Sequence, residues 1–338
     1  MGLALTLLMP AVMLVGLTLL HVYLRITYLD KMVRIFQEKP LFIVPRGQPV
    51  PEAEEVVFPN GEGQNLRGCY LRCEGPRRGV ILFGLEFGSN RWACVAYCQH
   101  LLQAGYDIFA FEPRNQGDSD SLPGYEPLQW VTDYEVRDMQ AALEYLKNRP
   151  DADPNGIGFF GISKGGGAGL LAAARDRYVR CFITDGIFAT YSTLVPYMRH
   201  WYRIYNSNYA VQGLLPSWYY GIIGRIGLRQ IERARRCHFP ALESAIARLS
   251  PRPLLMIHGG ADTYIKPEMA RKLFDRAREP KEFWLVEGAR HNQAFHLANA
   301  EYQRRVREFF DRHLAGDQGA SASLTRRQMP SAGAPENS

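Results

Sequence analysis

The sequence lacks the patterns that mark metal-binding and nucleic-acid-binding proteins. Its six cysteines form no C-x-x-C pair and no histidine stands at zinc-finger spacing, so we predict mostly buried thiols and no metal site. Lysine is scarce, with 7 residues against 33 arginines, and the densest basic cluster is only residues 233–236. Because the net charge of +6 is not gathered into long basic runs, we predict no nucleic-acid partner.

Charge is also absent from the start of the chain. No charged side chain occurs between Met1 and Leu24, and a helix of that length measures about 36 Å, which is enough to cross a bilayer. A cleaved signal peptide would have a basic start, a shorter apolar run and a small-residue cleavage site, and none of these is clear here. We therefore predict a transmembrane anchor over residues 1–24, with an atypical signal peptide and a buried core helix as the alternatives.

Basic residues follow this apolar segment but do not precede it. The first five of them are Arg25, Lys31, Arg34, Lys39 and Arg46. By the positive-inside rule, this asymmetry predicts that the folded part of the chain faces the cytoplasm. We expect a single-pass membrane protein in which residues 25–53 form a polar, partly helical stalk.

From residue 54 onward, short apolar runs alternate with helical patterns. The segments 55–58 and 66–73 flank Asn60-Gly61, a strong turn signal, and predict an antiparallel hairpin. Six uniformly apolar runs predict buried strands at 79–84, 107–111, 157–160, 181–184, 253–258 and 282–286. Helical spacing occurs at 92–104, 130–146, 166–174, 268–278 and 300–314. This alternation predicts an α/β fold, a mostly parallel sheet with helices on both faces.

The interval 188–250 breaks the alternation, because it is longer than an ordinary connection and carries nine Tyr and Trp side chains. Two interpretations stay open: a packed helical subdomain, or a lid that lines an apolar substrate pocket. We assign the interval to an inserted helical cap within a domain of residues 54–315. Residues 316–338 are rich in Ser, Ala, Gly, Gln and Pro, which predicts a disordered tail.

A G-x-S-x-G motif directly follows the apolar run 157–160. Residues 161–165 have the sequence Gly-Ile-Ser-Lys-Gly, and small residues continue after them. A serine at a tight strand-to-helix turn projects its hydroxyl above the sheet, and the flanking glycines avoid clashes with the neighbouring strand and helix. Alone the motif is weak evidence, but in this context it indicates Ser163 as a nucleophile.

Two further residues lie just past predicted strands. Asp262 follows the run 253–258 and His291 follows the run 282–286, so both are expected at the carboxyl edge of the sheet, where such folds place their ligands. A nucleophilic serine needs a base, and the base needs an orienting acid. Asp262 and His291 are therefore the candidates for these two roles.

The chain order Ser163, Asp262, His291 is that of the α/β-hydrolases. Residues 54–314 resemble the α/β-hydrolase superfamily, and the segment around Ser163 resembles its serine esterases, lipases and peptidase-like members. The resemblance implies that Ser163 is the nucleophile, His291 the general base and Asp262 the acid.

Each assignment has an alternative in the sequence. Asp185, at the end of the run 181–184, is a second position where some relatives carry the acid. His296 is an alternative to His291, but it falls in a predicted helix, and His258 resembles a structural residue at a strand end. We favour Asp262 and His291.

The resemblance also implies an oxyanion hole made by two backbone N–H groups. One belongs to Lys164, the residue after the nucleophile, and the other belongs to the loop after the run 79–84, where Leu85 is the candidate. The His-Gly pair common at this loop is here Phe83-Gly84, and Glu86 follows. Because a carboxylate near a developing oxyanion opposes catalysis, we expect Glu86 either to face solvent or to be compensated by Arg91 or Lys164.

These features predict a membrane-anchored serine hydrolase that needs no metal or organic cofactor. The aromatic cap and the anchor favour a lipophilic or small acyl ester, and the context of Ser163 also resembles acyl-CoA thioesterases. A catalytically silent hydrolase-fold binding protein is the alternative from another functional class.

Overall fold

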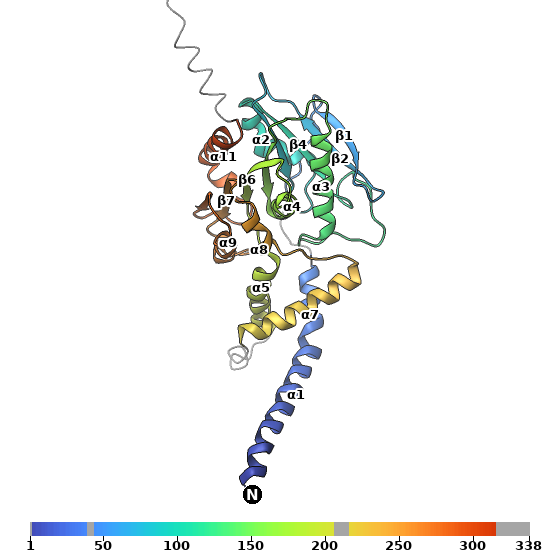
Figure 1. Ribbon diagram of the computed structural model, residues 1–338, viewed down its shortest axis with the longest axis vertical. Helices are drawn as coiled ribbons and strands as arrows, with labels where there is room; N and C mark the ends of the chain where they lie inside the picture. The colour runs from blue at the N-terminus through green and yellow to red at the C-terminus, as the bar shows by residue number, and fades with distance from the viewer. Residues whose placement is uncertain (1, 39–43, 206–215, 316–338) are drawn as a thin grey trace, which may run out of the picture.

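The computed structural model describes residues 2–38, 44–205 and 216–315, and its main body is an eight-stranded sheet (Figure 1). The strand order is β1-β2-β4-β3-β5-β6-β7-β8. Strand β2 is antiparallel to β1 and β4, whereas the other neighbouring strands are parallel. The strands are β1 (Glu54–Pro59), β2 (Asn65–Leu71), β3 (Gly79–Gly84), β4 (Tyr106–Glu112), β5 (Ile157–Ile162), β6 (Val179–Asp185), β7 (Leu254–Gly259) and β8 (Lys281–Val286). The predicted hairpin and mostly parallel sheet are therefore confirmed.

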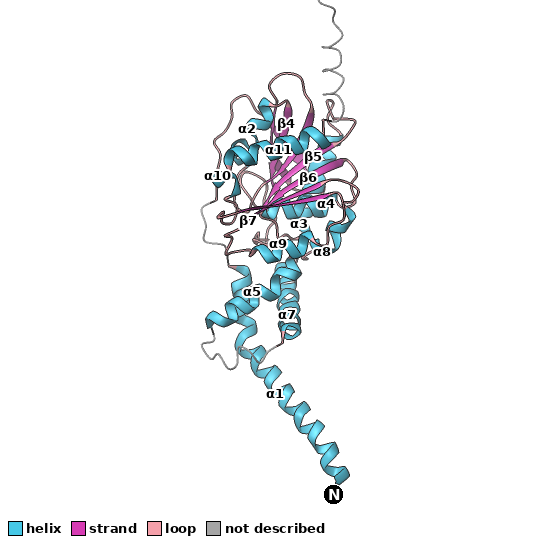
Figure 2. Cartoon of the chain, turned by 90° about the vertical axis from the view of Figure 1, so that its left-hand side faces the viewer, coloured by secondary structure: helices cyan, strands magenta, loops and turns pink. Residues whose placement is uncertain are grey.

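Helices cover both faces of the sheet (Figure 2). Alternate residues of a strand point to opposite faces, so Val80 and Leu82 belong to one core, and Ile81 and Phe83 belong to the other. Helices α3, α4, α8 and α9 pack on the first face, and α2, α10 and α11 pack on the second. Their bounds are α2 (Cys94–Gln103), α3 (Asp133–Lys147), α4 (Ser163–Ala173), α8 (Leu242–Ala245), α9 (Pro267–Phe274), α10 (Ala294–Leu297) and α11 (Asn299–His313). The cysteines are free and, apart from the half-buried Cys73, buried as predicted.

Two helix starts differ by three residues from those predicted, each for a local reason, and the other starts differ by one or two. Helix α3 begins three residues late, because Thr132 and Glu135 form a capping box that fixes its first turn. Helix α4 begins three residues early, at Ser163, because the turn out of β5 needs no connecting residue. Ser163 therefore directly follows the last residue of β5 and is itself the first residue of α4.

Helix α1 (Gly2–Gln37) crosses the boundary predicted between anchor and stalk. Its first part protrudes from the main body, and the stretch Met9–Ile26 has a mean hydropathy of 1.7 and is almost entirely exposed. Its last part packs against α7 (Ser217–Arg235), where Leu29 and Val33 contact Gly227. The division into a 24-residue anchor and a separate stalk stays a prediction, but the helix that carries it is continuous.

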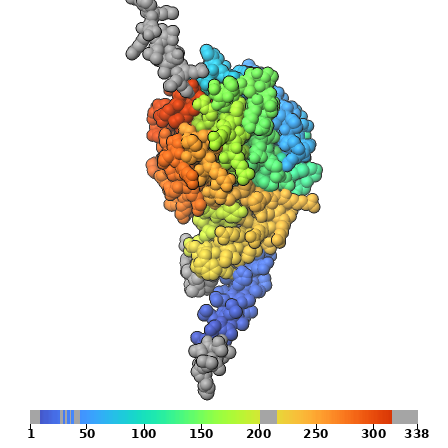
Figure 3. All heavy atoms as spheres, in the orientation of Figure 1, coloured from blue at the N-terminus to red at the C-terminus, as the bar shows by residue number. Residues whose placement is uncertain are grey.

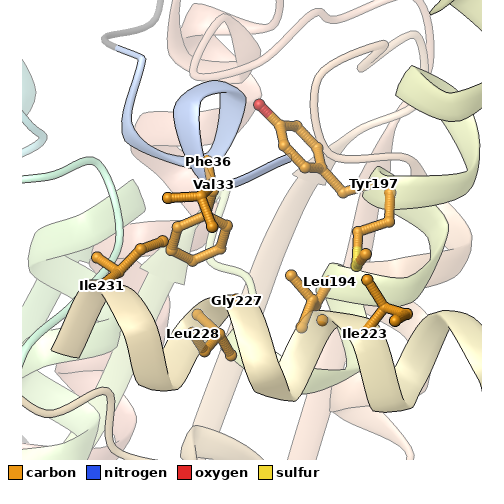
Figure 4. A pocket seen from close by; sticks show the side chains of 10 residues that line it. Val33, Phe36, Leu194, Tyr197, Ile223, Gly227, Leu228 and Ile231 are labelled. Carbon is orange, nitrogen blue, oxygen red and sulfur yellow. The ribbon is translucent and has the colours of Figure 1, made fainter. Parts of the chain in front are cut away.

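The predicted cap contributes α5 (Thr190–Tyr205), α7 and α8. Figure 3 shows α7 covering the region between the main body and the protruding part of α1. Figure 4 shows the seam where α1, α5 and α7 meet, lined by apolar side chains such as Phe36, Tyr197 and Leu228. The space left in this seam is about 20 Å³, room for a single water molecule, so the three helices are packed together. Residues 206–215 of the cap and the predicted tail 316–338 lie outside the described residues.

Aromatic contacts of Phe36 hold the end of α1 against the main body. Phe36 is buried and stacks on Trp130 with 4.3 Å between ring centroids, and the Trp130 indole N–H donates to the Phe36 carbonyl at 3.0 Å. Phe239 contacts the same ring of Phe36 edge-on. The last turns of α1 are therefore part of the folded domain.

We predict that Phe36→Ala lowers the free energy of unfolding by about 3 kcal/mol, because it removes a buried ring and leaves a cavity against Trp130. Thermal unfolding of the full chain in detergent, followed by circular dichroism, measures this loss. Tyr23→Ala, on the exposed part of the same helix, is the matched control and leaves the melting temperature unchanged. Equal melting temperatures of the two variants would show that the end of α1 does not contribute to the fold.

Candidate active site

Ser163 has a backbone conformation that only a tight turn imposes. Its φ is +47°, in the left-handed region that few residues other than glycine occupy. The residue before it, Ile162, is still extended as the last residue of β5, and α4 begins at the serine itself. A conformation of this kind costs on the order of 1–3 kcal/mol and persists only where the surrounding packing enforces it.

The glycines of the motif make this packing possible. A Cβ on Gly165 would overlap the carbonyl carbon of Gly84 and the carbonyl oxygen of Leu85, and a Cβ on Gly161 would overlap the Cα of Gly166. The loop after β3 therefore lies directly against the first turn of α4. This contact brings Leu85 next to Lys164, whose backbone N–H belongs to the first turn of the helix and has no partner four residues earlier.

Ser163, His291 and Asp262 form a continuous hydrogen-bond chain. The Ser163 Oγ lies 3.2 Å from the His291 Nε2, and the His291 Nδ1 lies 2.7 Å from the Asp262 Oδ2. Because an ionised carboxylate only accepts, Nδ1 donates to it, which leaves Nε2 to accept the serine hydroxyl proton. The second oxygen of Asp262 accepts the backbone N–H groups of Tyr264 and Ile265 at 2.9 and 2.8 Å. These two bonds fix the carboxylate that orients the imidazole.

The alternative residues are not members of this hydrogen-bond chain, although the His258 Nε2 lies 3.5 Å from the Asp262 Oδ2. Asp185 is buried at the end of β6 and accepts from the Tyr302 hydroxyl at 3.0 Å, while His291 faces Asp262. His258 is buried in β7, and its Nε2 lies 2.8 Å from the carbonyl oxygen of Ile265, as suits a structural residue. His296 is in α10 and exposed.

Neither expectation for Glu86 is correct. The side chain is buried, and its Oε2 accepts from the Asn292 amide at 2.7 Å. Arg91 pairs instead with Glu112 and Asp118. Glu86 turns inward because Asn292, directly after His291 and itself at a positive φ of 56°, offers it an amide donor. Burial raises the pKa of the Glu86 carboxyl above its ordinary value.

Lys164 is buried and also has a partner of its own. Its Nζ donates to Glu135 at 2.8 Å and to the carbonyl of Leu128 at 2.6 Å. Burial alone would raise the pKa of Glu135, but the Lys164 ammonium and the hydroxyls of Tyr125 and Thr132 keep this pKa below its ordinary value. The ion pair turns the side chain of Lys164 away from Glu86 and ties the start of α4 to α3.

A cavity of about 500 Å³ lies beside this hydrogen-bond chain. Tyr264 is one of its walls, and the same ring packs against the His291 ring with 5.1 Å between centroids. The Tyr264 hydroxyl donates to the Gln129 side-chain oxygen. The other lining residues come mainly from α5 and α9. They include the charged and polar side chains of Arg199, His200, Lys266 and Lys272, so the pocket is less apolar than we expected.

Known proteins with similar sequences share this fold. The alpha/beta hydrolase fold family matches residues 80–210. The uncharacterized protein YfhR of Escherichia coli (strain K12) is 30% identical over 252 residues, which cover 72% of this chain and 75% of YfhR. This chain belongs to the α/β-hydrolase superfamily. The predicted fold and the resemblance on which it depended are therefore confirmed.

Two further proteins are similar over different parts of the chain. The thiohydrolase aneE of Aspergillus aculeatus is 30% identical over 135 residues, 38% of this chain and 40% of aneE. The solved structure of the Pyrococcus furiosus esterase Pf2001 superposes with a TM-score of 0.60 at 20% identity, and it covers 82% of this chain and 100% of the esterase. At this identity, the second similarity shows the fold alone.

Sequence reasoning missed the residues that surround the hydrogen-bond chain. Gln129, Tyr264 and Asn292 contact it or its neighbours, and none carries a motif. The only signal in the sequence that could have indicated Tyr264 and Asn292 was their position within two residues of a predicted site residue. Their contacts depend on how distant segments meet, which no local pattern encodes.

The buried Asp185 predicts a pH-dependent stability. Burial raises the pKa of Asp185 from 3.8 to about 7, so the folded state favours the neutral acid. The contribution of Asp185 to the free energy of unfolding is fully present below pH 4. It is lost as the pH rises through 7, and the total loss is on the order of 4 kcal/mol. Asp185→Asn keeps an acceptor for Tyr302 but cannot ionise. We therefore predict that its melting temperature exceeds that of the wild type more at pH 8 than at pH 4.5.

Differential scanning fluorimetry at the two pH values measures this change, with the exposed Asp275→Asn as the matched substitution. If the melting temperatures of Asp185→Asn and wild type differ by the same amount at both pH values, the prediction that this buried carboxyl ionises near neutral pH is wrong.

Proposed function

We propose that this superfamily member is a serine hydrolase that cleaves an acyl ester of a lipophilic or small substrate. Ser163 is the nucleophile, His291 is the general base and Asp262 orients the base. The observation that carries the proposal is the unbroken chain from the Ser163 hydroxyl through both imidazole nitrogens to a buried carboxylate. The positive φ of Ser163 supports it, because strain of this kind clusters at active sites.

The proposed reaction has two halves. The Ser163 Oγ attacks the acyl carbonyl while His291 takes the proton of the hydroxyl. The resulting oxyanion accepts hydrogen bonds from the backbone N–H groups of Lys164 and Leu85. Collapse of this intermediate expels the alcohol, which takes the proton from His291, and leaves an acyl-enzyme. His291 then activates water to release the acid and restore Ser163.

The buried Glu86 is compatible with this chemistry when it is neutral. A carboxylate near the oxyanion would oppose the developing negative charge, but burial favours the protonated form of Glu86, whose pKa it raises. A protonated carboxyl still accepts from Asn292. The inward position of Glu86 therefore does not argue for a silent binding protein.

Thioester hydrolysis is the second candidate activity. Part of this chain is similar to the thiohydrolase aneE. The same serine, base and oxyanion donors would also act on the carbonyl of a thioester. The two candidates differ only in the leaving group, so a series of acyl chain lengths on p-nitrophenyl esters and acyl-CoAs separates them.

A fluorophosphonate probe tests the nucleophile. We predict that the full chain reacts with the probe and that Ser163→Ala abolishes labelling, because the probe needs a serine oxygen activated by a neighbouring base. Labelling is read by fluorescence after denaturing electrophoresis. Ser244→Ala, at an exposed serine of α8, is the matched control and keeps full labelling.

Asp262→Asn slows labelling by orders of magnitude if the carboxylate orients His291, because the wrong tautomer of the imidazole then faces the serine. A folded wild-type chain that takes up no probe would instead favour the hydrolase-fold binding protein.

We also propose that α1 anchors the protein in a membrane with the hydrolase domain on the cytoplasmic side. Support comes from the apolar stretch Met9–Ile26, which the described part of the main body leaves uncovered, and from the basic residues that follow it. The hydrolase domain would then act close to the bilayer surface, because the end of α1 is packed against it.

The anchor predicts that the full chain stays in the membrane pellet after extraction with alkaline carbonate. It also predicts that trypsin digests the hydrolase domain in inside-out vesicles and spares it in right-side-out vesicles, as seen by immunoblotting. Detergent-permeabilised vesicles are the control in which trypsin reaches the domain in both preparations. Release into the supernatant would contradict the anchor, and the reverse protection pattern would contradict the orientation.

A further inference from the structure

The cavity beside Tyr264 is lined by four separate parts of the chain, one of which is the start of α7 at Ser217. Helix α5 supplies Val195 and Arg199, the loop after β7 supplies Thr263 and Tyr264, and α9 supplies Met269. At about 500 Å³ the cavity is of the size that holds a small-molecule ligand. Because Tyr264 lies in its wall and packs on His291, this one ring connects the cavity to the proposed general base.

The charged side chains that line the cavity are all basic. Arg199, Lys266 and Lys272 carry permanent positive charge, and His200 adds a fourth basic group. None of the described lining residues is Asp or Glu. The cavity wall therefore carries a net charge of at least +3, although the chain as a whole is nearly balanced in charge.

Among the residues that the structure describes, Arg199, Lys266 and Lys272 also lack the carboxylate partners that other basic residues have. Lys147 pairs with Glu144 and Asp176, and Lys164 pairs with Glu135. Within the described part of the chain, Lys266 and Lys272 form no ion pair, and Arg199 bonds only to the Ser217 hydroxyl, at 3.0 Å, and lies over a tyrosine ring. Unpaired cations around a concave site attract and hold an anion.

We propose that this cavity binds the phosphate-bearing part of the acyl substrate, so that the hydrolase acts on phosphorylated acyl esters or thioesters. A phosphate group carries up to two negative charges and several acceptor oxygens, which match three cations better than a single carboxylate does. Arg199 presents a fork of donors from α5, while Lys266 and Lys272 provide flexible charges from the start and the body of α9. The acyl carbonyl then extends past Tyr264 toward Ser163. The inference depends on the proposed hydrolase function and defines its substrate class.

Two pairs of substrates test the charge requirement while the acyl group stays the same. The first pair is octanoyl-CoA and the uncharged octanoyl thioester of N-acetylcysteamine, and the second is 1-octanoyl-lysophosphatidate and 1-octanoylglycerol. We expect the full chain in neutral detergent to prefer the phosphorylated member of at least one pair by about tenfold or more in kcat/KM. A preference confined to one pair identifies whether the phosphate belongs to a coenzyme or to a lipid headgroup.

Charge-removing variants connect the preference to the cavity. Lys266→Gln/Lys272→Gln lowers it to threefold or less, and Arg199→Gln lowers it as well. Arg276→Gln/Arg307→Gln removes the same net charge from exposed positions outside the cavity and leaves the preference intact. Raising NaCl from 50 to 500 mM reduces the preference of the wild type, because exposed charges are screened.

The inference is wrong if neither phosphorylated substrate is preferred, or if the cavity variant keeps the preference as fully as the control variant does. Binding to Ser163→Ala, measured by calorimetry, keeps this result separate from the proposed catalysis. Phosphorylated ligands should bind about tenfold more tightly than their neutral counterparts, and Lys266→Gln/Lys272→Gln should abolish the difference. Equal binding of both members of each pair overturns the anion site even where the fluorophosphonate probe labels Ser163.

Discussion

The left-handed backbone of Ser163 is the constraint on which the site depends. A serine at φ +47° between β5 and α4 needs the glycines of the motif. Gly84 and Leu85 lie where a side chain on Gly165 would be, and Gly166 lies where one on Gly161 would be. The same close contact places the first turn of α4, whose backbone N–H groups have no partner within the helix, beside Leu85 in the loop after β3. The local cost is borne by the central strands of the sheet, which are buried on both faces.

The charges around the serine are arranged as a connected set. Lys164 extends away from the reacting atoms to Glu135 and to the carbonyl of Leu128. The next residue, Gln129, accepts the hydroxyl of Tyr264, whose ring packs on His291. The residue after Ser163 is thus linked, through the loop before α3, to the ring that packs on His291. A substitution at Glu135 therefore disturbs an element of the site without touching the serine.

Local patterns predicted most of the fold and the three residues of the hydrogen-bond chain. Most strands are short apolar runs. Ser163 follows one directly, and Asp262 and His291 come within the loops after two others, so topology brings all three to one edge. The inward position of Glu86 could not be predicted, because its partner Asn292 is 206 residues away. The extension of α1 into the fold was hidden for the same reason, since Phe36 packs on Trp130 from a segment with stalk-like polarity.

Trp130 also connects the proposed anchor to the cavity. One face of its ring stacks on Phe36 of α1, and its edge contacts Tyr197 of α5, which lines both the seam of the three helices and the basic cavity. Side chains packed this closely move together, because little space remains between them. The position of the cavity is thus fixed relative to α1. If α1 spans a bilayer, the cavity lies at a constant height above the membrane surface, within reach of substrates whose acyl chains begin in the lipid and whose phosphates lie in water.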